Sequence, residues 1–206
     1  MTQLGSPVIF KNNVICVYSN GEIISFNLKD WSINWSDVII GKYIGNTSSI
    51  ITNIATSPII IGDKCLVINA YSQMVLFDAA SGVRIWEKNI GSISQPLLIE
   101  KNLVFALCDN YIICISIENG DILWKFNIND LFKDKKEAKT TKWYGPLLVN
   151  NQLWIFSNSA YIAKFDLNNG KCINKQYIHH LRHSIAPIIV DKNMYSLANG
   201  SIYALR

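Results

Sequence analysis

Apolar residues in this chain come in runs of three to six, and residues that favour turns separate the runs. The stretch from residue 96 to 126 shows this most clearly, with polar breaks at 100–102, 109–110 and 119–120. The runs are rich in β-branched and aromatic residues and too short for helices, which predicts strands. The short turns favour antiparallel neighbours. Four strands are predicted here, at 96–99, 103–107, 112–117 and 122–126.

The same unit recurs along the whole chain, because all five prolines open an apolar triplet: Pro7, Pro58, Pro96, Pro146 and Pro187. Counting 28 residues from the first three prolines reaches Trp35, Trp86 and Trp124. Counting 24 from the second, third and fourth reaches Gly82, Gly120 and Gly170. The spacings between prolines are 51, 38, 50 and 41 residues, so a core unit of about 40 residues carries insertions, as in the blades of β-propellers.

Turn residues support the same repeat. Asn20-Gly21 and Asn199-Gly200 are predicted to form two-residue hairpin turns with positive φ at both positions. Later in units two to four, glycine closes the segments 79–82, 118–120 and 168–170, where the chain must reverse again.

One meander cannot cover both faces of its apolar strands, whereas blades stacked around an axis can. A tryptophan that recurs in the fourth strand could wedge between neighbouring blades. The predicted fold is therefore an all-β propeller of four-stranded antiparallel blades, with about four and a half blades. Residues 1–206 are expected to form one partial propeller domain, with repeat units that start near 7, 58, 96, 146 and 187.

Composition narrows the class of protein. Half of the 206 residues are apolar and 17% are charged, which suits a globular chain. No apolar run approaches 18 residues, and residues 1–7 lack the pattern of a signal peptide, so neither a membrane helix nor an export signal is expected. A net charge of +4 does not point to nucleic acid. Residues 133–142 hold five lysines and are predicted to form a solvated loop.

The five cysteines favour buried thiols over a disulfide scaffold or a zinc site, because their number is odd and no Cys-x-x-Cys pair occurs. Cys108 and Cys114 lie on one predicted hairpin. A two-residue turn at Asp109-Asn110 would place them opposite Tyr111 and Phe105, so a disulfide between them is not favoured.

The segment from Phe77 to Trp86 resembles the repeat of pyrroloquinoline-quinone-type propellers, with Asp78 closing strand three, Gly82 in the turn and tryptophan eight residues after the aspartate. Two units depart from the pattern, because Trp31 replaces the turn glycine in the first and Asn174 replaces the tryptophan in the fourth.

Within that superfamily, residues 143–154 and 199–206 resemble the BamB family, the propeller lipoproteins of the bacterial outer-membrane β-barrel assembly machinery. The resemblance implies an eight-bladed ring, so this chain is expected to be the C-terminal part of a larger propeller and a truncated or split product. A companion polypeptide could then supply further blades, although a closed five-bladed ring is an alternative. The implied location is the periplasmic side of the outer membrane.

Two classes of function follow from the resemblance. The first is a non-enzymatic scaffold that binds protein partners, by resemblance the outer-membrane barrel assembly protein. The second is a quinone-dependent dehydrogenase, whose site resembles a quinone disk between a tryptophan and a vicinal disulfide, with calcium beside it. No adjacent cysteines occur here, and a structural role suffices for Asp78 and Asp166 at their strand ends. The scaffold is therefore favoured, and no catalytic, cofactor-binding or metal-binding residues and no cofactor are predicted. A nonfunctional remnant is the third alternative.

All three histidines lie in one segment, His179-His180-Leu181-Arg182-His183, between units four and five. His179 and His183 would share a face only on a helix, and no carboxylate or cysteine lies within the motif. An exposed loop or contact patch is expected there rather than a metal site.

Overall fold

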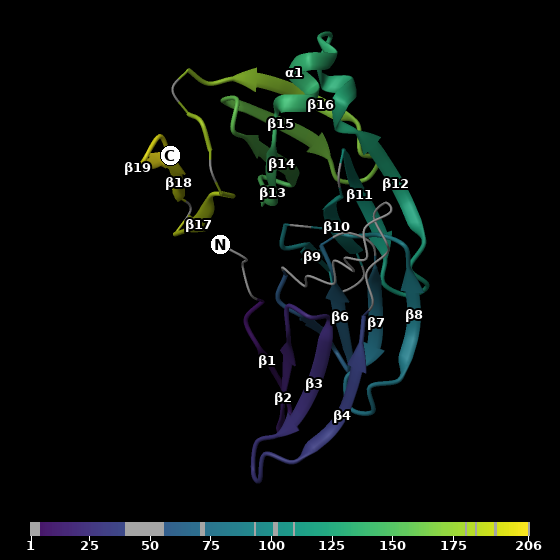
Figure 1. Cartoon of the computed structure of the whole chain (residues 1–206). Helices are drawn as coiled ribbons and strands as arrows, with labels where there is room; N and C mark the ends of the chain where they lie inside the picture. Colours follow the sequence, from purple (N-terminus) through teal and green to yellow (C-terminus); the bar gives the residue numbers. More distant parts are fainter. Residues whose placement is uncertain are drawn as a thin grey trace, which may run out of the picture. The chain divides into compact units, whose positions relative to one another are not determined.

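The computed structural model consists almost entirely of short antiparallel strands (Figure 1). It describes residues 5–39, 56–70, 73–92, 94–100, 103–108, 110–179, 181–183, 185–191 and 193–205, without the side chains of Val104 and Leu205. Every sheet follows chain order, so each one is a meander. The prediction of an all-β fold built from four-stranded antiparallel units is confirmed.

The strands form four four-stranded sheets and one three-stranded sheet. The first sheet has β1 (Val8–Phe10), β2 (Asn13–Val17), β3 (Glu22–Asn27) and β4 (Ile33–Val38). The second has β5 (Ile59–Ile61), β6 (Lys64–Ile68), β7 (Met74–Asp78) and β8 (Arg84–Lys88). The third has β9 (Leu97–Ile99), β10 (Leu103–Cys108), β11 (Tyr111–Ser116) and β12 (Ile122–Asn127). The fourth has β13 (Trp143–Val149), β14 (Gln152–Ser157), β15 (Tyr161–Asp166) and β16 (Cys172–Tyr177). The fifth has β17 (Ile188–Val190), β18 (Asn193–Ala198) and β19 (Ser201–Leu205).

The helical residues lie between the third and fourth sheets, in a 3-10 turn, η1 (Ile128–Leu131), and a short helix, α1 (Lys135–Thr140). The solvated loop predicted for residues 133–142 is therefore partly helical. The helix begins because the Asp134 side chain accepts a hydrogen bond from the Lys136 N–H, which is an N-cap. Among the described residues, no helix is long and apolar enough to cross a membrane.

The hairpin turns bear out one prediction and correct another. Asn199 and Gly200 have φ of 51° and 76°, as a two-residue turn of this hand requires. At the first hairpin, β2 ends at Val17 and β3 begins at Glu22, and of the predicted pair only Gly21 has positive φ. The Gly21 N–H donates to the Tyr18 carbonyl, so a longer turn that ends in one left-handed glycine reverses the chain.

The chain divides into two compact units, which are described separately. The first contains Met1–Gln95, Glu100–Leu103 and Ser116–Asp121, and the second contains Pro96–Ile99, Val104–Ile115 and Ile122–Arg206. In the first unit, the first and second sheets bury a shared core that includes Ile15, Ile23, Trp35, Cys65 and Phe77.

In the second unit, the third and fourth sheets meet through aromatic side chains. The rings of Phe126 and Phe165 lie edge to face with centroids 5.2 Å apart. Within the third sheet, the ring centroids of Phe105 and Trp124 lie 5.7 Å apart, and Phe165 and Phe105 are almost fully buried. Within each unit, the covered sheet faces therefore account for the apolar runs that do not alternate with polar residues.

Candidate functional site

Three tryptophans of the repeat each pack against a glycine of the next sheet. The glycine lies in the turn between strands three and four, and a Cβ built on it would lie 2.3 to 2.9 Å from the indole ring. Such a separation is too short for any side chain, so glycine is required by contact as well as by its positive φ. The pairs are Trp35 with Gly82 and Trp86 with Gly120 in the first unit, and Trp124 with Gly170 in the second.

The same indoles also form a hydrogen bond to the sheet that they contact. Each Nε1–H donates to the carbonyl of the first residue after strand three, at 2.9 to 3.1 Å. The acceptors are Ala79, Ile117 and Leu167. We call this arrangement the tryptophan–glycine contact. The sequence predicted that the tryptophans could wedge between neighbours, but only the structure shows the glycine and carbonyl that receive them.

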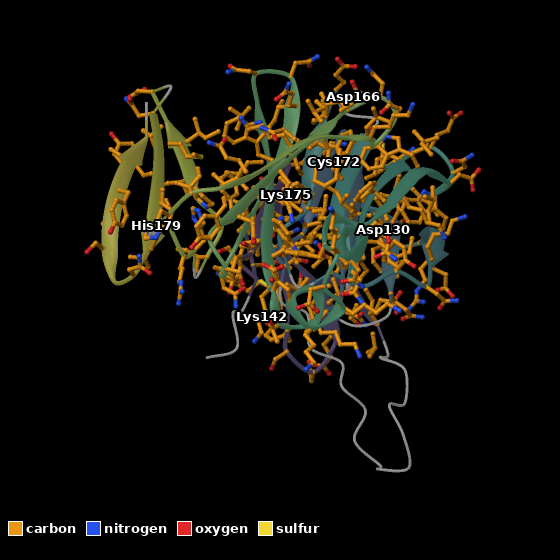
Figure 2. All side chains as sticks on the ribbon, turned by 90° about the horizontal axis from the view of Figure 1, so that it is seen from above. Asp130, Lys142, Asp166, Cys172, Lys175 and His179 are labelled. Atoms are coloured by element: carbon orange, nitrogen blue, oxygen red, sulfur yellow. The ribbon has the colours of Figure 1, made fainter. Side chains whose placement is uncertain are left out.

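The acidic residues at the ends of strand three stabilise their own turns. The Asp78 carboxylate accepts hydrogen bonds from the Ser81 N–H and hydroxyl at 2.8 and 2.7 Å. The hydrogen bond from the Ser81 side chain is the main cause that lowers the pKa of Asp78. Asp166, labelled in Figure 2, accepts from the N–H groups of Asn168 and Asn169 at 2.9 and 3.1 Å. These contacts are what a structural role requires.

Two positions interrupt the series of tryptophan–glycine contacts. Trp31 stands where the second to fourth sheets have glycine, and its φ of 60° is close to the 66° to 74° of those glycines. Its N–H donates to the Asn27 carbonyl as the Gly82 N–H does to Asp78. Its side chain is 66% exposed. At the other end of the series, Asn174 on β16 is exposed in place of the tryptophan.

A charged contact joins the fourth strands of the first two sheets. Arg84 on β8 donates to both carboxylate oxygens of Asp37 on β4, at 2.8 and 2.9 Å, and to the Val38 carbonyl. The Arg84 side chain is the largest cause of the lowered pKa of Asp37. Because both side chains are only partly exposed, this ion pair is less screened by solvent than a fully exposed one.

The histidine segment differs from the expectation of an exposed loop. His183 is only 2% exposed, and its Nδ1 lies 2.7 Å from the Ser196 hydroxyl of the fifth sheet. Its N–H donates to the Ser157 carbonyl of the fourth sheet, and its ring contacts Phe156. The prediction was wrong for His183 because an antiparallel β-bridge pairs it with Ala198, which places its side chain between the fourth and fifth sheets.

The other two histidines do not complete a site with His183. His179 is exposed and its ring contacts Tyr177, while His180 lies outside the described residues. The segment is not helical, so His179 and His183 do not share a helix face. Within the described part of the chain, no group of three or more His, Cys, Asp or Glu residues could hold a metal ion.

The segment between the third and fourth sheets, residues 128–142, contacts the fourth sheet through side chains. Lys175 on β16, labelled in Figure 2, donates to the Leu131 carbonyl at 2.6 Å, and its ammonium lies 4.2 Å from the Phe132 ring and 4.6 Å from the Tyr161 ring. The Tyr161 hydroxyl donates to the Glu137 carboxylate at 2.7 Å, which raises the pKa of Tyr161. No sequence signal marked these contacts, because the residues are far apart in the chain.

The cysteine thiols do not form a reactive cluster. Cys16, Cys65, Cys114 and Cys172 are free thiols, and burial raises the pKa of Cys65 to about 12 and of Cys114 to about 11. A thiol with a raised pKa is a poor nucleophile at neutral pH. The predicted register of Cys108 and Cys114 depends on Asp109, which lies outside the described residues.

Comparison with other proteins identifies relatives over nearly the whole chain. A protein of Rickettsia conorii without an assigned function is 24% identical over 209 residues, covering 96% of this chain and 48% of the relative. Outer membrane protein assembly factor BamB of Legionella pneumophila is 20% identical, covering 96% of this chain and 49% of that protein. BamB of Escherichia coli is 18% identical, and the match covers 90% of this chain and 45% of that protein. The chain spans about half the length of these curated relatives.

Solved structures show the same fold. BamB from Moraxella catarrhalis superposes with a TM-score of 0.71 at 16% identity, covering 97% of this chain and 60% of that one. A quinohemoprotein alcohol dehydrogenase from Pseudomonas putida gives a TM-score of 0.66 at 12% identity, covering 98% of this chain and 40% of that one. Both similarities establish a propeller-type fold. The family model described as outer membrane protein assembly factor BamB matches residues 1–126, and the chain therefore belongs to the BamB family of pyrroloquinoline-quinone-type repeat propellers.

Proposed function

We propose that this chain is a non-enzymatic scaffold subunit that acts in the assembly of outer-membrane β-barrel proteins, on the periplasmic side of that membrane. The observation that carries the proposal is the match of residues 1–126 to the BamB family model. BamB relatives that cover 90% or more of this chain support it.

The local chemistry is consistent with this proposal. The repeated tryptophans pack on glycines, the carboxylates of Asp78 and Asp166 bind turn N–H groups, and His183 lies between two sheets. These groups contribute to structure, so the function is assigned to protein contacts made by exposed turns and strand edges.

A finer part of the proposal concerns the rest of the ring. Because the chain spans about half of its curated relatives, we propose that further blades come from a companion polypeptide. Sheets bury their apolar faces by stacking, so such blades would cover surface that this chain exposes.

The proposal is tested with the detergent-solubilised barrel assembly protein of the same organism. The purified chain, alone and mixed with the polypeptide encoded immediately upstream, is titrated into it by isothermal calorimetry. Binding at a 1:1 ratio is expected. Absence of binding up to tens of micromolar by a chain whose circular dichroism shows folded β-structure would contradict the proposal.

The second candidate is a fragment of a quinone-dependent dehydrogenase, favoured by the similarity to the quinohemoprotein alcohol dehydrogenase. Titration with pyrroloquinoline quinone and Ca²⁺, followed by quinone absorbance and by dye reduction with an alcohol, separates the two. The scaffold proposal expects neither saturable quinone binding nor dye reduction, and both together would favour the enzyme.

A further inference from the structure

The segment between the third and fourth sheets presents a patch of positive charge. Its helix, α1, turns Ala138 inward, where this residue is buried. Because a helix has 3.6 residues per turn, the lysines at 135, 136 and 139 lie on the side opposite Glu137 and Ala138. Exposed lysines also stand just before and just after the helix. The five residues, which we call the lysine patch, are Lys133, Lys135, Lys136, Lys139 and Lys142.

Contacts with the fourth sheet hold the patch in a defined position. Glu137, on the inner side of α1, accepts a hydrogen bond from the Tyr161 hydroxyl at 2.7 Å. After the helix, the N–H of Lys142, labelled in Figure 2, donates to the Asn158 side chain at 2.8 Å. The Asn158 N–H donates back to the Lys142 carbonyl at 3.1 Å. These contacts use the backbone and the inner side of the helix, so the lysine side chains project from a fixed support.

The acidic residues of the segment neutralise the patch only in part. Asp134 caps the helix by accepting the Lys136 N–H, and Glu137 faces the fourth sheet. Asp130, also labelled in Figure 2, lies in the 3-10 turn that precedes the helix. None of the five lysines forms an ion pair with another residue that the structure describes. Five lysines against three acidic residues give residues 128–142 a net charge of +2.

The chemistry of the patch favours phosphate groups over the carboxylates of a protein partner. Protein interfaces are enriched in arginine and depleted in lysine, and arginine binds a carboxylate through two parallel hydrogen bonds. Residues 128–142 contain no arginine. Lysine acts as a point charge, and clusters of about four to eight basic residues on a helix attract anionic phospholipid surfaces.

An exposed aromatic side chain stands next to the lysine patch. Tyr177, at the end of β16, is 51% exposed, and its ring lies 5.3 Å from that of Tyr161, which in turn binds Glu137 of α1. Tyrosine is enriched at membrane–water interfaces, because its ring is apolar and its hydroxyl is polar. Lysines and an exposed tyrosine on one surface suit the headgroup region of a bilayer.

We propose that the lysine patch binds the surface of a bilayer that contains anionic phospholipids, with the lysine ammonium groups against the headgroup phosphates. The choice of a membrane over nucleic acid, which also presents phosphates, rests on the proposed function, because that function places the chain beside the outer membrane. Attraction of this kind is reversible and depends on salt.

Co-sedimentation of the full chain with vesicles of phosphatidylcholine that contain about 30% phosphatidylglycerol tests this proposal. The chain should bind these vesicles and not vesicles of phosphatidylcholine alone. Binding should be lost at about 0.5 M NaCl, where the Debye length is about 4 Å. Lys135→Gln combined with Lys139→Gln should weaken binding at least about tenfold, because each lysine near an anionic surface contributes about fivefold. Both side chains are exposed and glutamine is a good helix former, so this variant should keep its fold.

The matched control is Lys29→Gln combined with Lys171→Gln, which removes the same two charges. Both are exposed lysines in turns between strands three and four, and Lys171 follows the end of β15, whose first residue contacts α1. The control should leave vesicle binding unchanged. Equal weakening by the two double variants would mean that net charge alone causes binding, which overturns the proposal. A parent chain that does not bind the anionic vesicles overturns it too, as does binding that the α1 variant retains.

The calorimetric titration with the barrel assembly protein separates this inference from the proposed function. Both double variants should bind that protein as the parent does. If the α1 variant instead loses binding to the assembly protein and the parent does not bind vesicles, the patch belongs to an acidic protein surface and the lipid proposal fails. Vesicle binding by a chain that does not bind the assembly protein would contradict only the proposed function.

Discussion

His183 should make the stability of the second unit depend on pH in a range where most surface groups do not titrate. Its ring is buried between the fourth and fifth sheets, and burial lowers the pKa of His183 to about 4 from an ordinary 6.5. A protonated ring would also need an acceptor for Nε2–H, and Nε2 is buried without a hydrogen-bond partner in the described structure. The folded state therefore favours the neutral ring.

The sign and size of the effect follow from linkage. Between pH 6.5 and 4 the unfolded chain binds a proton at this histidine and the folded chain does not, so acid favours unfolding. The contribution is fully present above pH 6.5 and falls as the pH is lowered toward 4, where the loss levels off. The two pKa values give a total loss of about 3 kcal/mol, of which about 2 kcal/mol is lost by pH 5.

Urea unfolding at pH 7.5, 6 and 5, followed by circular dichroism, measures this loss. His183→Asn should reduce the pH dependence, because asparagine can still bind Ser196 but does not titrate in this range. His179→Asn is the matched control, since His179 is exposed, and it should behave like the parent. Equal pH dependence in the parent and the His183 variant would refute the reasoning.

Two further predictions concern contacts between sheets. Gly170→Ala should lower the free energy of unfolding by about 3 kcal/mol, because the added Cβ would lie 2.3 Å from Trp124. Gly62→Ala, at a similar φ but with open space around the added Cβ, should lower it by only about 1 kcal/mol. Urea unfolding compares the two variants, and equal losses would refute the packing argument. Arg84→Lys should lower the free energy of unfolding by about 1 kcal/mol, because lysine cannot make the bidentate contact with Asp37. This loss should be smaller in 1 M NaCl, which screens the ion pair. Unfolding at low and high salt measures it, and a loss that does not change with salt would contradict the prediction.

The fold was largely predictable because it depends on local patterns. Runs of apolar residues between turn formers define the strands, as at β10 to β12, where predicted and observed bounds agree within one residue. Glycine in the turn before strand four is also a local requirement, since Gly82 and Gly120 have positive φ. Such features need no knowledge of what packs against the sheet.

Most errors arose where a distant residue decides the outcome. No local pattern around His183 shows that it contacts Ser157 and Ser196. Likewise, no local pattern in residues 128–142 shows that Lys175 donates a hydrogen bond to Leu131. The turn predicted at Asn20-Gly21 is wrong for a local reason, because a longer turn that ends in one left-handed glycine joins the same strands.

The amino-acid sequence by itself determined the repeat, the antiparallel meanders and the recurring tryptophan, because strand and turn preferences act over a few residues. The tertiary structure decided which glycine each tryptophan contacts and which histidine is buried. These properties depend on packing between sheets. Residues brought together from different sheets are separated by dozens of positions, so their contacts leave no local pattern in the chain.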